Sequence, residues 1–389
     1  MKSERLSRSG RVVAFHWQSW EPVEIAWNDG VIASIASAPQ NARPETWIAP
    51  ALFDLQINGY GGVDFQKEDL TTEELRRAAR ALRRDGCARF FLTLVTSEWN
   101  GLLARLRHAK ARRDADPELR AAIAGWHIEG PFISGVKGFV GAHPPEHVSD
   151  PDPGKICALR EATGSDPVLL TLAPERAGAM DAIAHAVSLG MTVFGGHSDA
   201  SGAQLDAAVA RGLTGFTHLG NGCPQALDRH DNILWRVLER PEILASMIPD
   251  TIHVAPAPFR VLHAARGGRN LIYTTDAMAA GGAPPGRYSF GKTMLEVGAD
   301  QIVRLPGASN FAGSALTPAQ GVFRSAAMLR RPWQECWMRF STAAAEAVGC
   351  RAGLRVGEPA DFCLIRPSGG PSPAALETWF RGELYETAD

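Results

Sequence analysis

The sequence predicts a (β/α)8 barrel of the TIM-like kind, with a small β-sandwich domain formed by both chain ends. Three observations support this prediction. Short β-rich segments alternate with helix-like segments along the middle of the chain, polar side chains follow the ends of those strands, and β-rich segments recur at both termini. The expected boundaries are 1–50 and 353–389 for the small domain and 51–352 for the barrel.

Eight strands are expected in the barrel. Between them lie segments such as 71–86 and 202–212, which have the spacing of amphipathic helices and end in glycine. A doubly wound sheet has the same alternation, but no GxGxxG follows the first strand. The strands are expected at 51–58, 89–96, 125–132, 167–175, 191–198, 215–221, 243–254 and 271–277.

The two ends of the chain are β-rich as well. Near the N-terminus these are segments 11–17 and 22–36, the second of which contains the turn Asn28-Asp29-Gly30. Near the C-terminus they are segments 353–365 and 378–386. Because the termini of a domain often lie close together, these segments are expected to pair into one small domain.

Composition excludes several classes of function. The 389 residues are 45% hydrophobic and 21% charged, with a formal net charge of -2, so nothing suggests a nucleic-acid partner. No segment has the uninterrupted apolar length of a membrane span, so no membrane partner is expected. The six cysteines are scattered without a CxxC pair, which favours a cytoplasmic location.

Polar residues of the kinds used in catalysis occur at the C-terminal ends of the expected strands. In a (β/α)8 barrel these ends form one face, where active sites lie. A single cavity lined by all of these side chains is therefore predicted. The residues are Asn58, Glu129, Glu175, His197, His218, His253 and Asp276.

Glu129, His197 and His218 are the natural metal ligands in this set. One carboxylate and two imidazoles leave an open position on a tetrahedral cation, as in catalytic zinc sites. Asp276 is expected in the same cavity as the acid/base, with a helix N-cap as its alternative role. Each histidine alone could equally be a core residue, and His127 is expected either to face the barrel exterior or to support a neighbour.

Seven short motifs follow one another between residues 125 and 362: GWHIEGPF, TLAPE, GGHSDA, FTHLGN, TTDAMAAGG, FAGSALT and GEPADF. Together they resemble the N-acetylglucosamine-6-phosphate deacetylases of the amidohydrolase superfamily. The resemblance implies a barrel with a β-sandwich from both chain ends, and it implies the same three ligands and the same acid/base.

The resemblance also implies how the site is completed. Many amidohydrolases begin the barrel with His-x-His, but this chain has Gln56 and Asn58 there, so one divalent metal ion per subunit is expected. Zinc is the expected ion, with Fe²⁺ or another divalent ion as the alternatives. His143 matches a histidine that polarises the acetyl carbonyl.

The implied substrate contacts are Asn221, Gly222, Arg229 and His253, the last two for a phosphate group. Arg229 matches an arginine that reaches the neighbouring subunit's site, which implies a homodimer. The family usually reads T-H-L-F/Y-N-A-M where this chain reads THLGNGC, with Gly220 in place of the aromatic residue. The departure could reshape the sugar pocket.

The expected function is therefore metal-dependent deacetylation of N-acetylglucosamine 6-phosphate to glucosamine 6-phosphate and acetate. Two alternatives remain open at this point. One is a related amidohydrolase acting on another N-acyl amino sugar, such as N-acetylgalactosamine 6-phosphate. The other is a non-catalytic protein that binds a sugar phosphate.

Overall fold

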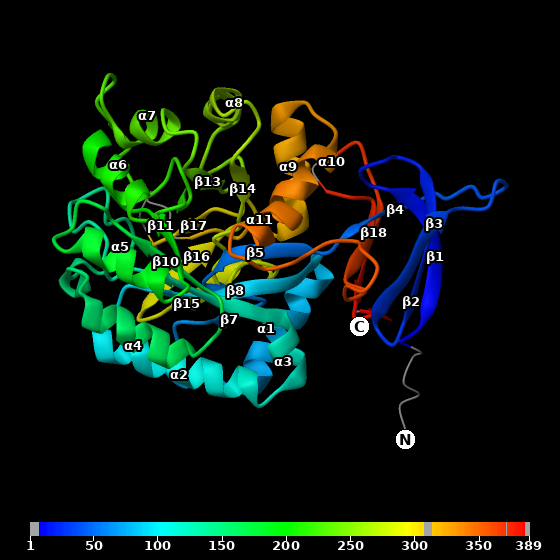
Figure 1. The fold of residues 1–389 in the computed structure, drawn as a ribbon, viewed down its shortest axis with the longest axis horizontal. Coiled ribbons are helices and arrows are strands. Elements are labelled where there is room, and N and C mark those ends of the chain that lie inside the picture. The colour runs from blue at the N-terminus through cyan, green and yellow to red at the C-terminus, as the bar shows by residue number, and fades with distance from the viewer. Residues whose placement is uncertain (1–7, 307–312, 371, 386–389) are drawn as a thin grey trace.

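Eight parallel strands form the centre of the molecule, in a computed structural model that describes residues 8–306, 313–370 and 372–385 (Figure 1). Each overlaps one of the eight predicted segments, and the order is consecutive, from β14 through β8 to β5. A parallel bridge between Ile57 and Ala277 joins the first strand to the segment that follows the last one. The predicted (β/α)8 barrel is confirmed. The strands are β5 (Leu52–Ile57), β8 (Cys87–Val95), β9 (Ile123–Glu129), β10 (Val168–Leu172), β11 (Thr192–Gly195), β12 (Gly215–Phe216), β13 (Leu244–Met247) and β14 (Leu271–Tyr273).

Helices surround this barrel, and side-chain caps define where several of them begin. Thr71 and Glu74 form a capping box at α1, and Ser201 and Gln204 form another at α6. The helices are α1 (Thr72–Arg84), α2 (Trp99–Asp114), α3 (Pro117–Ala122), α4 (Pro153–Thr163), α5 (Ala179–Ser188), α6 (Gly202–Ala210), α7 (Ile233–Leu238), α8 (Pro256–Ala265), α9 (Pro318–Leu329), α10 (Trp333–Trp337) and α11 (Thr342–Glu346), with 3-10 turns at Pro145–His147 and Met338–Phe340. Among the described residues, no helix combines the length and the apolar character that crossing a membrane requires.

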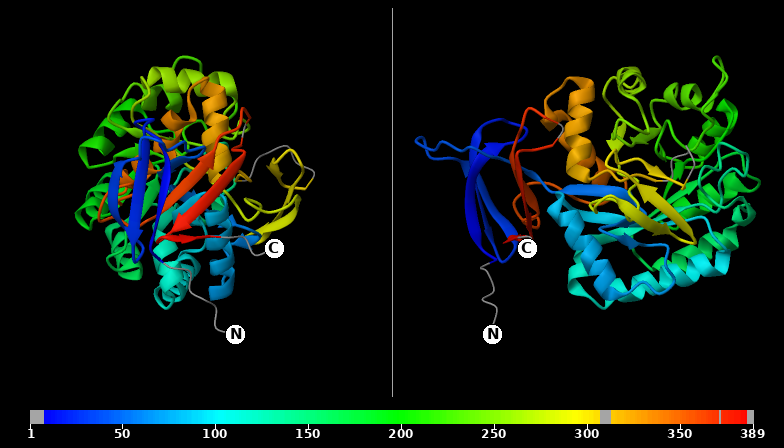
Figure 2. Two further views of the ribbon diagram at one scale, coloured as in Figure 1. Left: turned by 90° about the vertical axis from the view of Figure 1, so that its right-hand side faces the viewer. Right: turned by 180° about the vertical axis from the view of Figure 1, so that it is seen from behind.

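Both chain ends contribute to a second domain beside the barrel, as Figure 2 shows from two further sides. Its seven strands join in the order β20-β19-β18-β4-β1-β2-β3. Trp27, Phe362 and Trp379 pack together in it, with ring centroids 5.1–5.5 Å apart. The boundaries at 50 and 353 stay a prediction, and residues 1–7, 371 and 386–389 of the predicted domain lie outside the described residues. The strands are β1 (Gly10–His16), β2 (Pro22–Asn28), β3 (Val31–Ser37), β4 (Trp47–Pro50), β18 (Phe362–Arg366), β19 (Ala375–Phe380) and β20 (Glu383–Leu384).

A small three-stranded sheet between β14 and α9 was not predicted from the sequence. Its strands are β15 (Gly286–Phe290), β16 (Thr293–Val297) and β17 (Val303–Arg304). It is tied to the hairpin of β6 (Gly59–Tyr60) and β7 (Val63–Asp64), because the backbone amide of Gly291 donates to Asp64 Oδ2 at 2.7 Å.

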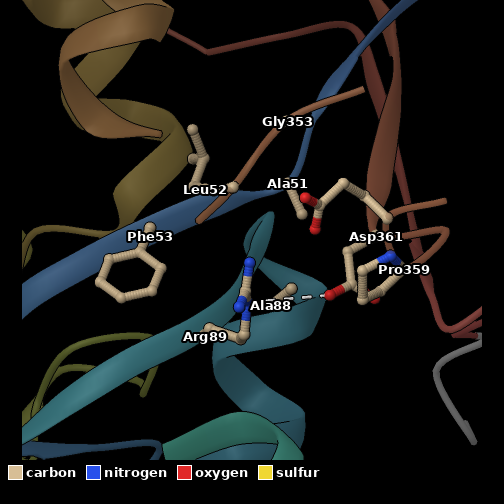
Figure 3. A pocket seen from close by; sticks show the side chains of 10 residues that line it. Ala51, Leu52, Phe53, Ala88, Arg89, Gly353, Pro359 and Asp361 are labelled. Carbon is tan, nitrogen blue, oxygen red and sulfur yellow. Dashed lines mark ion pairs between the residues drawn. The ribbon is translucent and has the colours of Figure 1, made fainter. Parts of the chain in front are cut away.

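Arg89 connects the barrel to the end domain, beside a cavity of about 10 Å³, roughly the space of one water molecule (Figure 3). Its guanidinium lies 3.8 Å from the Asp361 carboxylate and donates to the carbonyl of Arg351. Burial raises the pKa of Asp361, so the nearby cation offsets part of the cost of ionising it.

Replacing Arg89 with alanine is expected to lower the free energy of unfolding by about 1–3 kcal/mol, because a buried carboxylate would lose its cation. Urea unfolding followed by circular dichroism measures the effect. Arg107→Ala, on an exposed position of α2, is the matched control. Equal unfolding free energies for the two variants would contradict the role of Arg89.

Candidate active site

The polar residues at the strand ends converge at the C-terminal face of the barrel. Glu129 is the last residue of β9, and His197 and His218 follow β11 and β12 within two residues. All three side chains are buried. Glu129 Oε1 lies 2.9 Å from His218 Nε2 and 3.4 Å from His197 Nε2, and the two imidazole nitrogens are 3.1 Å apart. The structure thus brings the three predicted ligands together.

The spacing of these atoms suits a bound cation. Two ligands held at 2.0–2.1 Å on a tetrahedral ion are about 3.3 Å apart, close to the observed separations. His197 Nδ1 lies 2.7 Å from the carbonyl oxygen of Phe139, a contact that places the hydrogen on Nδ1 and leaves Nε2 free to bind a metal. Burial opposes ionisation of Glu129, yet the His197 and His218 imidazoles more than offset it and hold the pKa of Glu129 well below its usual range.

His143 is a fourth member of this group. Its Nε2 lies 3.9 Å from Glu129 Oε2, and its ring centroid is 4.4 Å from that of His197. Glu129, His143 and His197 present ligand atoms within 4.8 Å of one another, so this trio too could hold a metal. The predicted trio with His218 is more compact, and His143 Nδ1 is engaged by Thr96 Oγ1 at 2.8 Å.

The backbone is strained at three of these strand ends. His197, His218 and Asp276 have φ values of 49°, 34° and 52°, in the left-handed region that side chains other than glycine rarely adopt. Such conformations persist where the surrounding structure enforces them, and they concentrate at functional sites.

Asp276 follows β14, at the seam where β14 meets β5. Its Oδ1 accepts a hydrogen bond of 2.7 Å from Asn58 Nδ2. Burial, with the Glu129 carboxylate nearby, raises the pKa of Asp276 to about 7. On the β5 side of the seam, Gln56 Nε2 donates to Glu129 Oε1 at 2.9 Å, so this amide occupies one face of the carboxylate.

The structure decides between the two alternatives for His127 and shows what Glu175 contacts. His127 does not face the barrel exterior: it is fully buried, two residues before Glu129 on the same face of β9, and its Nε2 lies 2.8 Å from Thr171 Oγ1. Glu175 follows a strand as predicted, but its carboxylate accepts hydrogen bonds from Ser198 and Asp199 and so holds the loop after His197.

The four predicted substrate contacts differ in how buried they are and in which residues they contact. Gly222 lies against the metal cluster, since a Cβ there would be 3.0 Å from His197 Nδ1 and 3.1 Å from His218 Cε1. Asn221 is partly buried beside it. His253 is held in a turn by Asp250, 2.5 Å from its Nδ1, whereas Arg229 is exposed in the loop before α7 and donates to His230.

Several supporting residues were missed by the sequence analysis, above all Asp54, Thr96 and Thr275. The available signal for Asp54 was its place as an acid within the apolar run ALFDLQIN. In the structure it is fully buried and accepts hydrogen bonds from the hydroxyls of both Thr274 and Thr275.

Several known proteins of similar sequence are deacetylases of amino sugar phosphates. An N-acetylglucosamine-6-phosphate deacetylase of Vibrio furnissii is 30% identical, with 97% of this chain and 94% of that protein aligned. An N-acetylgalactosamine-6-phosphate deacetylase of Escherichia coli O157:H7 is 30% identical over 67% of this chain and 68% of that protein. No family model matches the chain.

Among solved structures, a mutant of N-acetyl-D-glucosamine-6-phosphate deacetylase from Mycobacterium smegmatis, in complex with N-acetyl-D-glucosamine-6-phosphate, superposes with a TM-score of 0.86. The two sequences are 28% identical, and the match covers 97% of this chain and 100% of the other.

Proposed function

We infer that this chain, which belongs to the N-acetylglucosamine-6-phosphate deacetylase family of the amidohydrolase superfamily, hydrolyses N-acetylglucosamine 6-phosphate to glucosamine 6-phosphate and acetate. The observation that carries the proposal is the convergence of Glu129, His197 and His218 on one point, with the Asp276 carboxyl close by. A module that only binds sugar phosphate has no need for such a combination of ligands and a proton carrier.

Glu129, His197 and His218 are proposed to hold one divalent ion, with zinc as the first choice and Fe²⁺ as the alternative. When bound, such an ion supplies electrophilic activation of water and of the acetyl carbonyl. Gln56 supports a single ion, because its amide contacts Glu129 where other amidohydrolases have a histidine ligand.

The remaining steps belong to residues of the chain. Asp276 accepts a proton as water attacks the acetyl carbon and delivers it to the sugar nitrogen as the C–N bond breaks. Asn58 orients this carboxylate. His143 is proposed to donate from Nε2 to the acetyl oxygen, with its ring held by the contact of Nδ1 with Thr96 Oγ1 at 2.8 Å.

The phosphate is proposed to contact Asn221, Gly222, His253 and, from a second subunit, Arg229. The exposure of Arg229 on one chain supports this assignment, because an arginine that serves a neighbouring subunit's site has to project from its own surface. A planar guanidinium can bind phosphate through two hydrogen bonds. The proposed assembly is therefore a homodimer, and all six cysteines, which the structure shows as free thiols, support a cytoplasmic location.

Replacing Arg229 with alanine is expected to raise KM for the phosphorylated sugar by about 10–100-fold, the cost of losing hydrogen bonds to a charged group. Activity on the unphosphorylated sugar should stay unchanged. Arg211→Ala, an exposed arginine at the end of α6, is the control for surface charge. An unchanged KM in the Arg229 variant would remove this residue from the phosphate site.

The galacto isomer is the second candidate substrate, because one relative with 30% identity is a deacetylase of N-acetylgalactosamine 6-phosphate. The loop after His218 also favours keeping this alternative. Gly220 has a φ of 99° and leaves no side chain where the family usually has an aromatic ring.

Acetate release by the purified, metal-loaded protein tests the proposal. N-acetylglucosamine 6-phosphate, its unphosphorylated form and the galacto isomer are compared at equal concentrations. Fast release from the first alone is expected. Release from the galacto isomer alone would keep the reaction and replace the substrate, and release from none would refute the proposed function.

A further inference from the structure

The turn that carries Asp276 is fixed at almost every backbone group. It comprises Thr275, Asp276 and Ala277, just after β14. Thr275 N donates to Asp54 Oδ2 at 3.1 Å, and the Thr275 carbonyl accepts from Ser314 Oγ at 2.5 Å. The Asp276 carbonyl accepts from Ser314 N at 3.0 Å, and the Ala277 carbonyl from Asn58 N at 2.7 Å. The left-handed Asp276 is thus bracketed by hydrogen bonds to the β5 segment and to Ser314.

Another backbone amide of this turn, that of Ala277, depends on a single side chain. Ala277 N donates to Thr275 Oγ1 at 3.1 Å, a bond that spans Asp276 and closes the turn around it. The Thr275 hydroxyl in turn donates to Asp54 Oδ2 at 2.6 Å. Because the hydrogen points at the carboxylate, a lone pair of Oγ1 is left facing Ala277 N.

Asp54 is built into the seam of the barrel. It accepts from four donors: Thr274 Oγ1 at 2.5 Å, Thr275 Oγ1, Thr275 N and the backbone amide of Gln56 at 3.2 Å. Asp54, Thr274 and Thr275 are each 0% exposed, so water cannot substitute for a lost partner. In the described part of the chain, one isolated bridge joins β5 to the segment after β14. The side chains of Asp54, Thr274 and Thr275 therefore make much of the contact that closes the barrel.

We propose that Thr275 is a positioning residue whose hydroxyl, oriented by the Asp54 carboxylate, holds Asp276 in its left-handed conformation and aims its carboxylate at Asn58 and the reacting atoms. The catalytic consequence rests on the proposed function. The conformational consequence stands independently, because it concerns the turn alone.

The competing explanation is that Thr275 only helps to close the seam of the barrel. A comparison with Thr274 distinguishes this explanation from the positioning role. Thr274 precedes Thr275, is equally buried and also donates its hydroxyl to Asp54, whereas the bond from Ala277 N goes to the Thr275 hydroxyl. Thr274→Val and Thr275→Val therefore remove one hydroxyl each from the same carboxylate. The second alone releases the amide that closes the turn around Asp276.

Steady-state kinetics and crystal structures of the two variants test the proposal. Thr275→Val is expected to lower kcat by about 100-fold with little change in KM, the cost of an ångström-scale misplacement. Its structure should show Ala277 N released and the 2.7 Å contact between Asp276 and Asn58 lost. Thr275→Ser, which keeps the hydroxyl, should restore kcat and the contact between Asp276 and Asn58. Thr274→Val should lose thermal stability but keep kcat within about threefold.

Equal losses of kcat in the two valine variants, or an unmoved Asp276 in the Thr275→Val structure, would overturn the proposal. If Thr275→Val does not fold, Thr275→Ala provides the same comparison without the added methyl group. If the wild-type protein releases no acetate, the proposed function fails, but the position of Asp276 in the variant structures still decides the inference.

Discussion

Replacing Asp276 with asparagine is expected to lower kcat for deacetylation by about 10²–10⁴-fold, the usual contribution of a positioned general acid/base. An amide cannot take up the proton that the carboxylate accepts as water attacks. The shape is preserved, and the amide oxygen can still accept the hydrogen bond from Asn58. Metal content should stay at the wild-type level, because the three proposed ligands are untouched.

Acetate release measures the kcat of the Asp276→Asn variant, and elemental analysis of the same preparation measures its metal content. Asp64→Asn is the matched control, because Asp64 is a buried carboxyl that accepts hydrogen bonds from the backbone amides of Gln66 and Gly291 instead of Asn58. A kcat within about tenfold of wild type in Asp276→Asn would move the proton-transfer role to another group, and His143 would be the next candidate.

The barrel and the grouping of the candidate ligands were predictable because both follow from local patterns. Alternating strand and helix segments specify the (β/α)8 order, and strand ends in such a barrel share one face. Residues as distant along the chain as Glu129 and His218 could therefore be grouped from the sequence alone. The chemistry of a carboxylate beside imidazoles then indicated a metal, and no contact between specific atoms was needed for this step.

What could not be predicted depends on contacts between distant segments. The hydrogen bonds of Asp54 to Thr274 and Thr275 join positions 220 and 221 residues apart, and no local pattern records them. The sheet of β15–β17 is short and half exposed, so it leaves little hydrophobic signal. The inward position of His127, by contrast, follows from two-residue periodicity along β9, so the alternative of an exterior position could have been excluded from the sequence.

Replacing Glu129 with glutamine is expected to weaken metal binding by more than about 100-fold, since even changes in residues that only support ligands cost 10–100-fold. The substitution removes the negative charge and one strong donor while keeping the shape. Deacetylation should fall with the metal content. Titration against a competing chelator gives the affinity, and elemental analysis after dialysis gives the stoichiometry.

Glu175→Gln is the matched control for this experiment. Glu175 also follows a barrel strand, but its carboxylate accepts hydrogen bonds from Ser198 and Asp199 in the loop after His197, so its replacement should weaken metal binding much less than that of Glu129. Retention of one ion per chain by Glu129→Gln, at wild-type affinity, would contradict the proposed ligand set.

Histidine variants would then locate the ion, because two imidazoles compete for the position beside Glu129 and His197. His218 Nε2 lies 2.9 Å from the Glu129 carboxylate and His143 Nε2 lies 3.9 Å from it, so the shorter contact favours His218 as the proposed ligand. His218→Ala should therefore lose the ion, whereas His143→Ala should keep the ion and lose kcat. The reverse pattern would exchange the two roles and place the His218 imidazole against the acetyl group.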